Sequence, residues 1–249
     1  MSSAPQTAVH LRELKLSAMA EAYERQAEQP KLHQLSFDDR FAMLVEAEWA
    51  ERDSRKLKRL MRRASLPEAA AIEDIDFRAS RGLDKAELAA LASCIWMRKQ
   101  QNLVILGPTG VGKTWLACAF AAQACRLRLA ATFYRASQLF GEIGVAVLDG
   151  SLPRLKLALT RPTLLVIDDL GVGEMSLQAA HVLLEVIDRR MRTGSLLITS
   201  QYPTDQWHGF FPDPTIADAV LDRVIHQSHR ITLKGESMRK LRAKRQMQE

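Results

Sequence analysis

An eight-residue run in the middle of the chain constrains its fold more than any other feature. Residues 107–114 read G-P-T-G-V-G-K-T, which fills every fixed position of the pattern G-x-x-x-x-G-K-[ST]. The run follows an apolar segment over 102–106 and precedes a helical pattern over 115–125. In this strand–loop–helix context the pattern is typical of a phosphate-binding loop rather than of a chance glycine-rich turn. The chain is therefore predicted to bind a nucleoside triphosphate.

Each residue type in the loop has a separate physical role. The glycines let backbone N–H groups turn toward one anion, and the following helix adds the positive end of its dipole. The Lys113 side chain can reach the β- and γ-phosphates, and the Thr114 hydroxyl can bind Mg²⁺. A dinucleotide-binding turn is excluded because the run does not fit G-x-G-x-x-G. The residues expected to contact the nucleotide here are Gly107, Pro108, Thr109, Gly110, Val111, Gly112, Lys113, Thr114 and Trp115.

A second apolar run ends in two acids. Residues 164–167 are apolar and are followed by Asp168 and Asp169, as expected of a buried strand that delivers carboxylates to the phosphate end of a parallel sheet. In this Walker B pattern Asp168 would complete the Mg²⁺ site and Asp169 would polarise the attacking water. The second position is often Glu in such ATPases, so the division of roles between the two aspartates stays open. Two acids that only cap a strand are the alternative interpretation.

Three further polar residues are candidates for the hydrolytic site. Gln201 follows the next predicted strand and would orient the attacking water, unless it is an ordinary turn residue. Arg223 could act as an arginine finger on the γ-phosphate of a neighbouring subunit, or be a surface residue paired with Asp222. Arg239, at the start of a predicted last helix, is a candidate sensor of the nucleotide in its own subunit, with the same surface alternative.

The chain divides into a helical part and an α/β part. Residues 11–64 contain no glycine and carry apolar residues at helix-like spacings, and Ser36 with Asp39 indicates the start of a helix that runs into the basic stretch. Beyond residue 102, apolar strands alternate with helices, which predicts a parallel sheet with helical crossovers. We expect a helical N-terminal domain over 1–66, a linker over 67–82, and an α/β P-loop domain with a basic C-terminal helix over 83–249.

The alternation also predicts the individual elements of the α/β part. Apolar runs bounded by turn residues predict the strands, and apolar residues at a 3.6-residue period predict the helices. A second amphipathic pattern leads from residue 83 into the strand before the phosphate loop. Strands are expected over 102–106, 131–134, 164–168, 195–200 and 230–234, and helices over 115–125, 136–148, 176–192 and near 216–225.

Charge is unevenly spread along the chain. The formal net charge is +6, yet residues 1–51 hold five Lys or Arg against nine Asp or Glu. Residues 52–63 hold seven basic residues against Asp53 alone, and the tail over 223–249 holds eight basic against two acidic. Basic side chains every three or four residues suit phosphate contacts, which position a protein on duplex DNA without reading its sequence; a solvated helix face is the alternative. The side chains expected to contact DNA are Arg52, Arg55, Lys56, Arg59, Arg62 and Arg63.

Composition excludes several other classes. The three cysteines are an odd number with no C-x-x-C pair, which argues against a disulfide framework or a zinc site and favours buried core thiols. No apolar run approaches the roughly 20 residues that a membrane helix needs, and the N-terminus lacks a secretory pattern. We therefore expect a cytoplasmic protein without a membrane partner.

Taken together, these motifs resemble the AAA+ ATPases of the helicase-loader branch, and most closely the IstB-like ATP-binding proteins that assist insertion-sequence transposases. The resemblance covers nearly the whole chain. The phosphate loop and the Walker B acids are shared by many ATPases, whereas the linker and the Gly-Glu-Ser-x-Arg ending are more specific. Beyond the nucleotide motifs, the resemblance is carried by Leu14 to Met19, Ile75 to Phe77, Arg81 to Lys85, Thr199 to Gln201, Asp222 to Val224, and Gly235 to Lys240.

The resemblance implies more than the motifs alone do. It implies an AAA+ ATPase that uses ATP and Mg²⁺, and that assembles on duplex DNA as a ring or helical homo-oligomer with little sequence preference. It also implies deformation of that DNA, stimulation of an IstA-like transposase, and an Arg223 that acts between subunits. A replicative helicase loader is the alternative, because it shares the ATPase core and differs chiefly in its partner. A small-molecule kinase shares only the phosphate loop, and this chain has a strand-end sensor where such kinases have Arg-rich lids.

Overall fold

The computed structural model describes residues 4–77, 81–238 and 240 of the 249-residue chain. Tertiary contacts divide the chain into two units, residues 1–59 and 60–249, and the boundary falls within one long helix. The domain boundaries expected from the sequence, after residues 66 and 82, stay predictions. Among the described residues, no helix combines the length and the apolar character that crossing a membrane requires.

The first unit is helical, as the glycine-free sequence predicts. The Ser36 hydroxyl accepts a hydrogen bond from the Asp39 backbone N–H at 3.1 Å, which confirms the predicted helix start. The nearly buried Glu48 carboxylate accepts hydrogen bonds from the N–H groups of Ala18 and Met19, at 3.1 and 3.2 Å, and so caps the first turn of the preceding helix. The elements are α1 (Ala4–Glu13), α2 (Ser17–Glu28), the 3₁₀ turn η1 (Pro30–Gln34) and α3 (Phe37–Ala64), whose last residues belong to the second unit.

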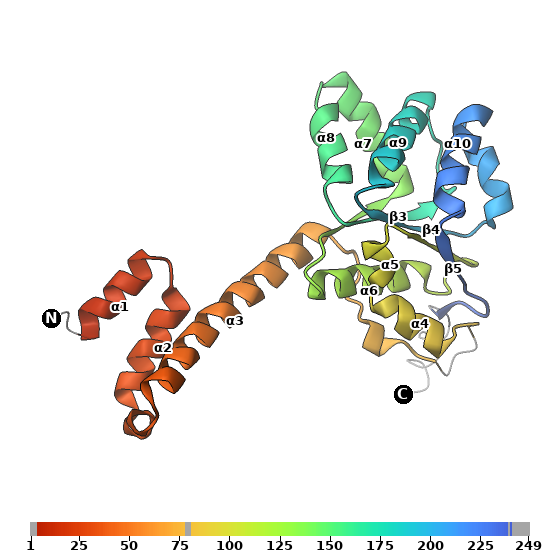
Figure 1. Cartoon of the computed structure of the whole chain (residues 1–249). Helices are drawn as coiled ribbons and strands as arrows, with labels where there is room; N and C mark the ends of the chain where they lie inside the picture. Colours follow the sequence, from red (N-terminus) through yellow and green to blue (C-terminus); the bar gives the residue numbers. More distant parts are fainter. Residues whose placement is uncertain (1–3, 78–80, 239, 241–249) are drawn as a thin grey trace. The chain divides into compact units, whose positions relative to one another are not determined.

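The second unit is built on a five-stranded parallel sheet (Figure 1). Its strand order is β2-β3-β4-β1-β5, and the predicted strand at 164–168 continues two residues further than expected. All four neighbouring pairs run in parallel, which confirms the predicted α/β class. The strands are β1 (Asn102–Leu106), β2 (Ala131–Arg135), β3 (Leu164–Leu170), β4 (Ser195–Ser200) and β5 (Ser228–Thr232).

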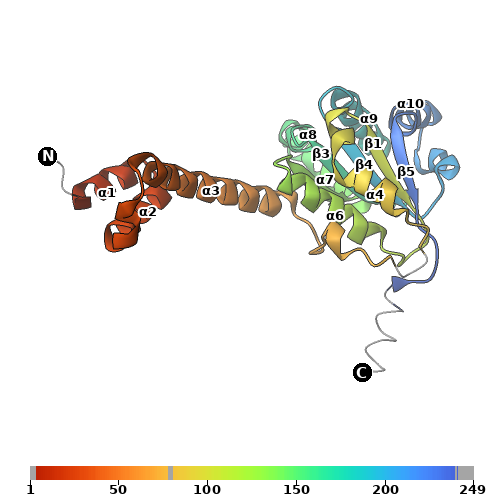
Figure 2. The ribbon, with the colours of Figure 1, turned by 60° about the horizontal axis from the view of Figure 1, so that its bottom comes forward.

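Helices cover both faces of this sheet. In Figure 1, α6 lies on one side of the strands and α7 to α10 lie on the other, where residues of α7, α9 and α10 share one buried cluster. Figure 2 also shows α6 and α9 on opposite sides of the strands. Four helices match predicted segments, whereas α8, which begins with a Pro at its first turn, and the 3₁₀ turns were not expected. The remaining elements are η2 (Ile72–Asp74), α4 (Lys85–Ala92), α5 (Ile95–Arg98), α6 (Lys113–Arg126), α7 (Ala136–Leu148), α8 (Leu152–Thr160), α9 (Leu177–Arg190), η3 (Thr204–Phe210) and α10 (Pro214–Ile225).

The core lies between the sheet and its helical layers. Residues of alternating parity along a strand face opposite sides, so Val104 and Leu165 face the cluster formed with α7, α9 and α10. All three cysteines are buried and free, as expected of core thiols, and burial raises the pKa of the Cys118 thiol to about 12. In the described part of the sheet both faces are covered by helices, so a ligand can reach the sheet at the ends of the strands and along the two outer strands.

Candidate active site

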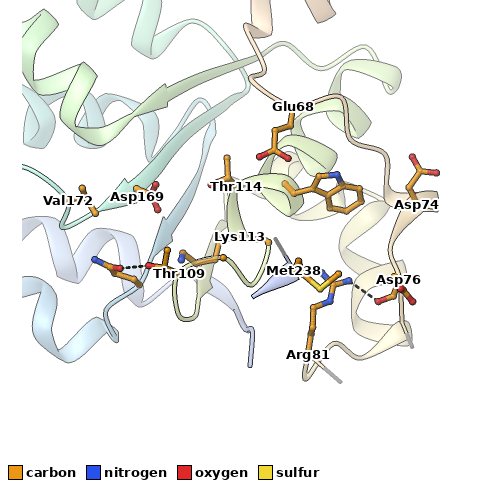
Figure 3. A pocket seen from close by; sticks show the side chains of 14 residues that line it. Glu68, Asp74, Asp76, Arg81, Thr109, Lys113, Thr114, Asp169, Val172 and Met238 are labelled. Atoms are coloured by element: carbon orange, nitrogen blue, oxygen red, sulfur yellow. Dashed lines mark hydrogen bonds between the residues drawn. The ribbon is translucent and has the colours of Figure 1, made fainter. Parts of the chain in front are cut away.

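A cavity of about 530 Å³ lies where the carboxyl ends of β1, β3 and β4 meet (Figure 3). Strand β4 pairs with both β1 and β3, so the loop after β1 and the acids at the end of β3 flank the end of β4. Ligands of open α/β sheets bind at this edge. Residues predicted from three separate motifs therefore converge on one pocket, and Lys113, Asp169 and Gln201 are among those that line it.

The phosphate loop adopts the conformation that its glycines permit. Gly107, Gly110 and Gly112 all have positive φ angles, of 148°, 87° and 99°. A Cβ atom on Gly107 would lie 2.5 Å from the Leu233 carbonyl oxygen, so even alanine would not fit there. Helix α6 begins at Lys113, so its N-terminus points its free N–H groups at the loop. The Lys113 ammonium is nearly buried and donates a hydrogen bond to the Pro108 carbonyl at 3.1 Å, inside the curve of the loop.

A hydrogen-bonded chain of side chains links the loop to both strands. The Thr114 hydroxyl donates to Asp168 Oδ2 at 2.9 Å, and the Thr199 hydroxyl donates to Asp168 Oδ1 at 2.6 Å. Asp168 is fully buried. Burial raises the pKa of its carboxyl, the nearby charge of Asp169 adds to the rise, and the hydrogen bonds from Thr199 and Thr114 oppose it. A cation beside this carboxylate would stabilise its ionised form.

Asp169 occupies a different environment from its neighbour. The pairing of β3 with β4 shifts register between Ile167 and Leu170, and Asp169 itself has a left-handed backbone with a φ of 57°. Its backbone N–H donates to the Thr199 hydroxyl at 2.9 Å, while the residue lines the pocket. Aspartate tolerates this backbone conformation through its short polar side chain. The bulge therefore turns two adjacent acids in different directions, one into the sheet and one toward the pocket.

Thr199 is a site residue that sequence reasoning missed. The sequence singles out the polar end of β4 and favours Gln201, whose side-chain oxygen accepts a hydrogen bond from Thr109 at 2.8 Å and which lines the pocket. Thr199, two residues earlier and fully buried, instead contacts both acids. The available signal was a pair of hydroxyl residues, Thr199 and Ser200, at the end of the apolar run of β4. The hydrogen bonds of Thr199 with Asp168 and Asp169 depend on the pairing of β4 with β3, which the sequence does not show.

A Thr199→Val protein is expected to hydrolyse ATP about 10 to 100 times more slowly than wild type, because valine keeps the shape but cannot orient Asp168. Steady-state phosphate release over a series of Mg²⁺ concentrations checks this, and the Mg²⁺ requirement should rise. Thr132→Val on β2 provides the matched control and should leave the rate unchanged. Equal rates for the two variants would show that the Thr199 hydroxyl does not support the site.

The segment expected as a linker forms one wall of the pocket. Glu68, Asp74, Asp76 and Arg81 all line it, and in Figure 3 Arg81 and Asp76 lie on the opposite side of Lys113 from Asp169. The Arg81 side chain is 6% exposed, and its guanidinium donates to the Asp76 carbonyl at 2.8 Å.

Arg81 also approaches the phosphate loop itself. One of its guanidinium nitrogens lies 3.3 Å from the position that a Cβ on Gly112 would take. Trp115, predicted as a nucleotide contact, lines the same pocket. Sequence reasoning placed Arg81 in a segment that carries the family resemblance but assigned it no role at the site.

Arg223 lies away from this pocket. Its backbone carbonyl accepts a hydrogen bond from the Asn102 side chain at 3.5 Å, which places it at the start of β1, whereas the phosphate loop follows the end of that strand. A five-residue strand spans about 13 Å. The Arg223 guanidinium pairs with Asp188 on α9 rather than with Asp222, and it donates to the Ala219 carbonyl at 2.7 Å.

The last predicted site residue, Arg239, lies outside the described residues. Its neighbour Met238 lines the pocket, and the Met238 backbone N–H donates to the Gly110 carbonyl at 2.9 Å. A Cβ on Gly110 would also collide with the Ser237 side chain. The described start of the C-terminal segment therefore packs directly on the phosphate loop.

The basic side chains predicted to contact DNA all lie exposed on α3. Arg52 pairs with Glu48 at 2.7 Å and Arg55 pairs with Glu51 at 2.5 Å, each one helical turn back. Within the part of the chain that the structure describes, the other four form no ion pair. These four unpaired residues are Lys56, Arg59, Arg62 and Arg63.

Comparison with known proteins agrees with this geometry. A family model described as "IstB-like ATP binding protein" matches residues 9–247. An insertion sequence ATP-binding protein of Sinorhizobium fredii is 41% identical over 225 residues, which cover 90% of this chain and 92% of that protein. The insertion sequence IS1162 ATP-binding protein of Pseudomonas fluorescens is 43% identical over 199 residues, 80% of this chain and 86% of that protein. The crystal structure of DnaI, 20% identical, superposes with a TM-score of 0.57 over 71% of this chain and 94% of that chain, which shows a shared fold.

Proposed function

The chain belongs to the IstB-like ATP-binding protein family and is an AAA+ ATPase; from this premise we propose that it assembles on duplex DNA and stimulates a transposase of the IstA type. ATP promotes the DNA-bound homo-oligomer, a ring or helical filament, and hydrolysis releases or resets it. The observation that carries the proposal is the group of exposed basic side chains on α3 that form no ion pair among the described residues, a group that includes Lys56, Arg59, Arg62 and Arg63. The insertion-sequence names of its relatives support a partner from the same element.

The pocket supports a division of labour in hydrolysis. The loop N–H groups, the α6 N-terminus and Lys113 hold the phosphates, and Thr114 with Asp168 offers the oxygen ligands that suit Mg²⁺. Mg²⁺ held there would neutralise charge on the β- and γ-phosphates. Asp169, which lines the pocket, polarises the attacking water, and Gln201 helps to orient it.

Four exposed cations on one helix suit the phosphate backbone of a duplex. Phosphate contacts release counterions, so each one contributes roughly 0.9 to the slope of log affinity against log salt. Because they carry no base-specific hydrogen bonds, we expect binding with little sequence preference. Arg52 and Arg55 contribute less, since each would first have to leave a glutamate.

Replacing Lys56, Arg59, Arg62 and Arg63 together with alanine is expected to lower the salt slope by roughly 3 to 4 and the affinity by at least about tenfold at low salt. Mobility shift on a random-sequence duplex, with ATP, ADP or no nucleotide at several salt concentrations, measures both. The matched control removes four exposed basic residues that lie off α3, namely Lys31, Arg98, Lys99 and Arg192.

The outcomes separate the proposal from its alternative. Unchanged binding by the α3 variant would show that DNA lies elsewhere on the protein. A wild-type protein that binds no duplex under any nucleotide condition would remove the DNA proposal. Capture of a replicative helicase, without the transposase, in parallel pull-downs would replace it with helicase loading.

A further inference from the structure

A second cavity lies along the outer edge of the sheet. Arg63 of the basic stretch on α3 and Arg135, which lies opposite Asp168 in the β2–β3 pairing, are among the residues that line it. The volume of this cavity is about 1040 Å³, roughly twice that of the nucleotide pocket. The whole of β2 lines it, together with residues of α7 and α8 on one side and the segment from Leu60 to Pro67 on the other. All of these residues belong to the second unit. The cavity is therefore a groove whose length follows an edge strand.

The edge of β2 presents backbone groups to this groove. In the described sheet β2 is one of the two edge strands and pairs only with β3. The Leu164 N–H donates to the Ala130 carbonyl at 3.0 Å. In a parallel pair every second residue directs its backbone N–H and C=O to the same neighbouring strand, so Thr132 and Tyr134 also direct theirs to β3. The N–H and C=O groups of Phe133 then point outward, into the groove that this residue lines. An open edge of this kind is a template for one more strand.

The groove is also strongly positive. Four arginines line it, at positions 63, 135, 154 and 161, and all four side chains are exposed. Across the described residues, none of the four guanidinium groups takes part in an ion pair. Glu142 is the one acid among the residues that line the groove. Unpaired guanidinium groups bind carboxylates in bidentate geometry.

We propose that this groove binds an extended, acidic peptide segment of a partner protein, which adds to β2 as a sixth strand. The two features point to one occupant: the strand edge supplies ladder hydrogen bonds, and the arginines flanking it supply partners for carboxylates. Leu157 is 50% exposed in the same groove. It offers an apolar surface against which apolar side chains at every second residue of the bound segment can pack.

Charge and shape argue against other occupants. The C-terminal residues 241–249 carry three basic residues and a single acid, so this segment of the chain would be repelled. Duplex DNA could contact the arginines but offers nothing in register with the outward N–H and C=O groups of a strand. A partner segment of alternating acidic and apolar residues can form backbone hydrogen bonds with the edge of β2 and pair its carboxylates with the arginines.

The test uses the full-length protein and a fluorescein-labelled ten-residue peptide in which glutamate alternates with valine. Fluorescence anisotropy should show saturable binding, weakened about tenfold or more in R154E/R161E, because both contacts become repulsive. The control R98E/R192E reverses two exposed arginines outside the groove and should bind as wild type does. A peptide of equal charge with prolines at two central valines lacks the N–H groups for a ladder and should bind at least about tenfold more weakly.

Neither groove arginine in this variant lies at the nucleotide pocket, so its ATPase rate and thermal unfolding report whether the fold is intact. Absent binding to the wild-type protein, equal binding by R154E/R161E, or equal binding of the proline peptide would each overturn the proposal. Loss of duplex binding in R154E/R161E with peptide binding retained would also overturn it, and would assign the groove to nucleic acid.

Discussion

An Asp169→Asn protein is expected to bind ATP about as tightly as wild type does and to hydrolyse it about 10² to 10⁴ times more slowly. Asparagine keeps the size of the side chain and tolerates the left-handed backbone found here, but it cannot accept a proton from water. The phosphate loop, Lys113 and Thr114 stay in place, so the ground-state contacts to the nucleotide survive. The loss should therefore appear in kcat.

Two measurements separate binding from chemistry in this variant. Equilibrium titration with a fluorescent ATP analogue reports affinity, and single-turnover phosphate release reports the chemical step. Glu174→Gln, an exposed acid in the loop after β3, is the matched control. Under the proposed cycle, the slow variant should also stay on DNA in the presence of ATP longer than wild type does. Weak ATP binding combined with the slow rate would instead assign Asp169 to the nucleotide-binding shell.

The parts of this site that sequence predicts are those written in local patterns. The phosphate loop needs glycines at fixed spacing, because positive φ angles and close backbone approach admit no other residue at Gly107. The acids of β3 follow an apolar run that only a buried strand explains. Each of these signals spans fewer than ten residues, and each appears in the structure where it was expected.

The parts that sequence misses depend on which strands are neighbours. Thr199 acquires its role because β4 lies between β1 and β3, and strand order is not written in any short segment. Arg190 illustrates the same limit in the core. It looks like an ordinary arginine at a helix end, yet it is 1% exposed and donates to four carbonyls, two of which belong to Leu159 and Ser195. Burial lowers its pKa to about 10. The hydrogen bonds of Arg190 depend on how α9 packs against other segments, so no short stretch of sequence predicts them.

An Arg223→Ala protein is expected to lose ATPase activity by about 10³-fold or more in the assembled state, if assembly places this arginine at a neighbour's γ-phosphate. Its position at the start of β1 leaves it remote from the pocket of its own subunit. The ion pair with Asp188 is half-exposed, with side chains 31% and 46% accessible, so it adds little to stability. Asp188→Asn, which removes the ion pair and keeps the arginine, should therefore retain most of the activity.

Mixing two inactive proteins tests whether Arg223 acts between subunits. In an equimolar mixture of Arg223→Ala with Asp169→Asn, about one quarter of the head-to-tail interfaces join an intact Asp169 to an intact Arg223. ATPase activity should then return to about one quarter of wild type, although neither protein is active alone. An arginine with a structural role, or one that acts within its own subunit, gives no such recovery. Because both substitutions are then present on separate chains, recovered activity can arise only from a site completed by a neighbour.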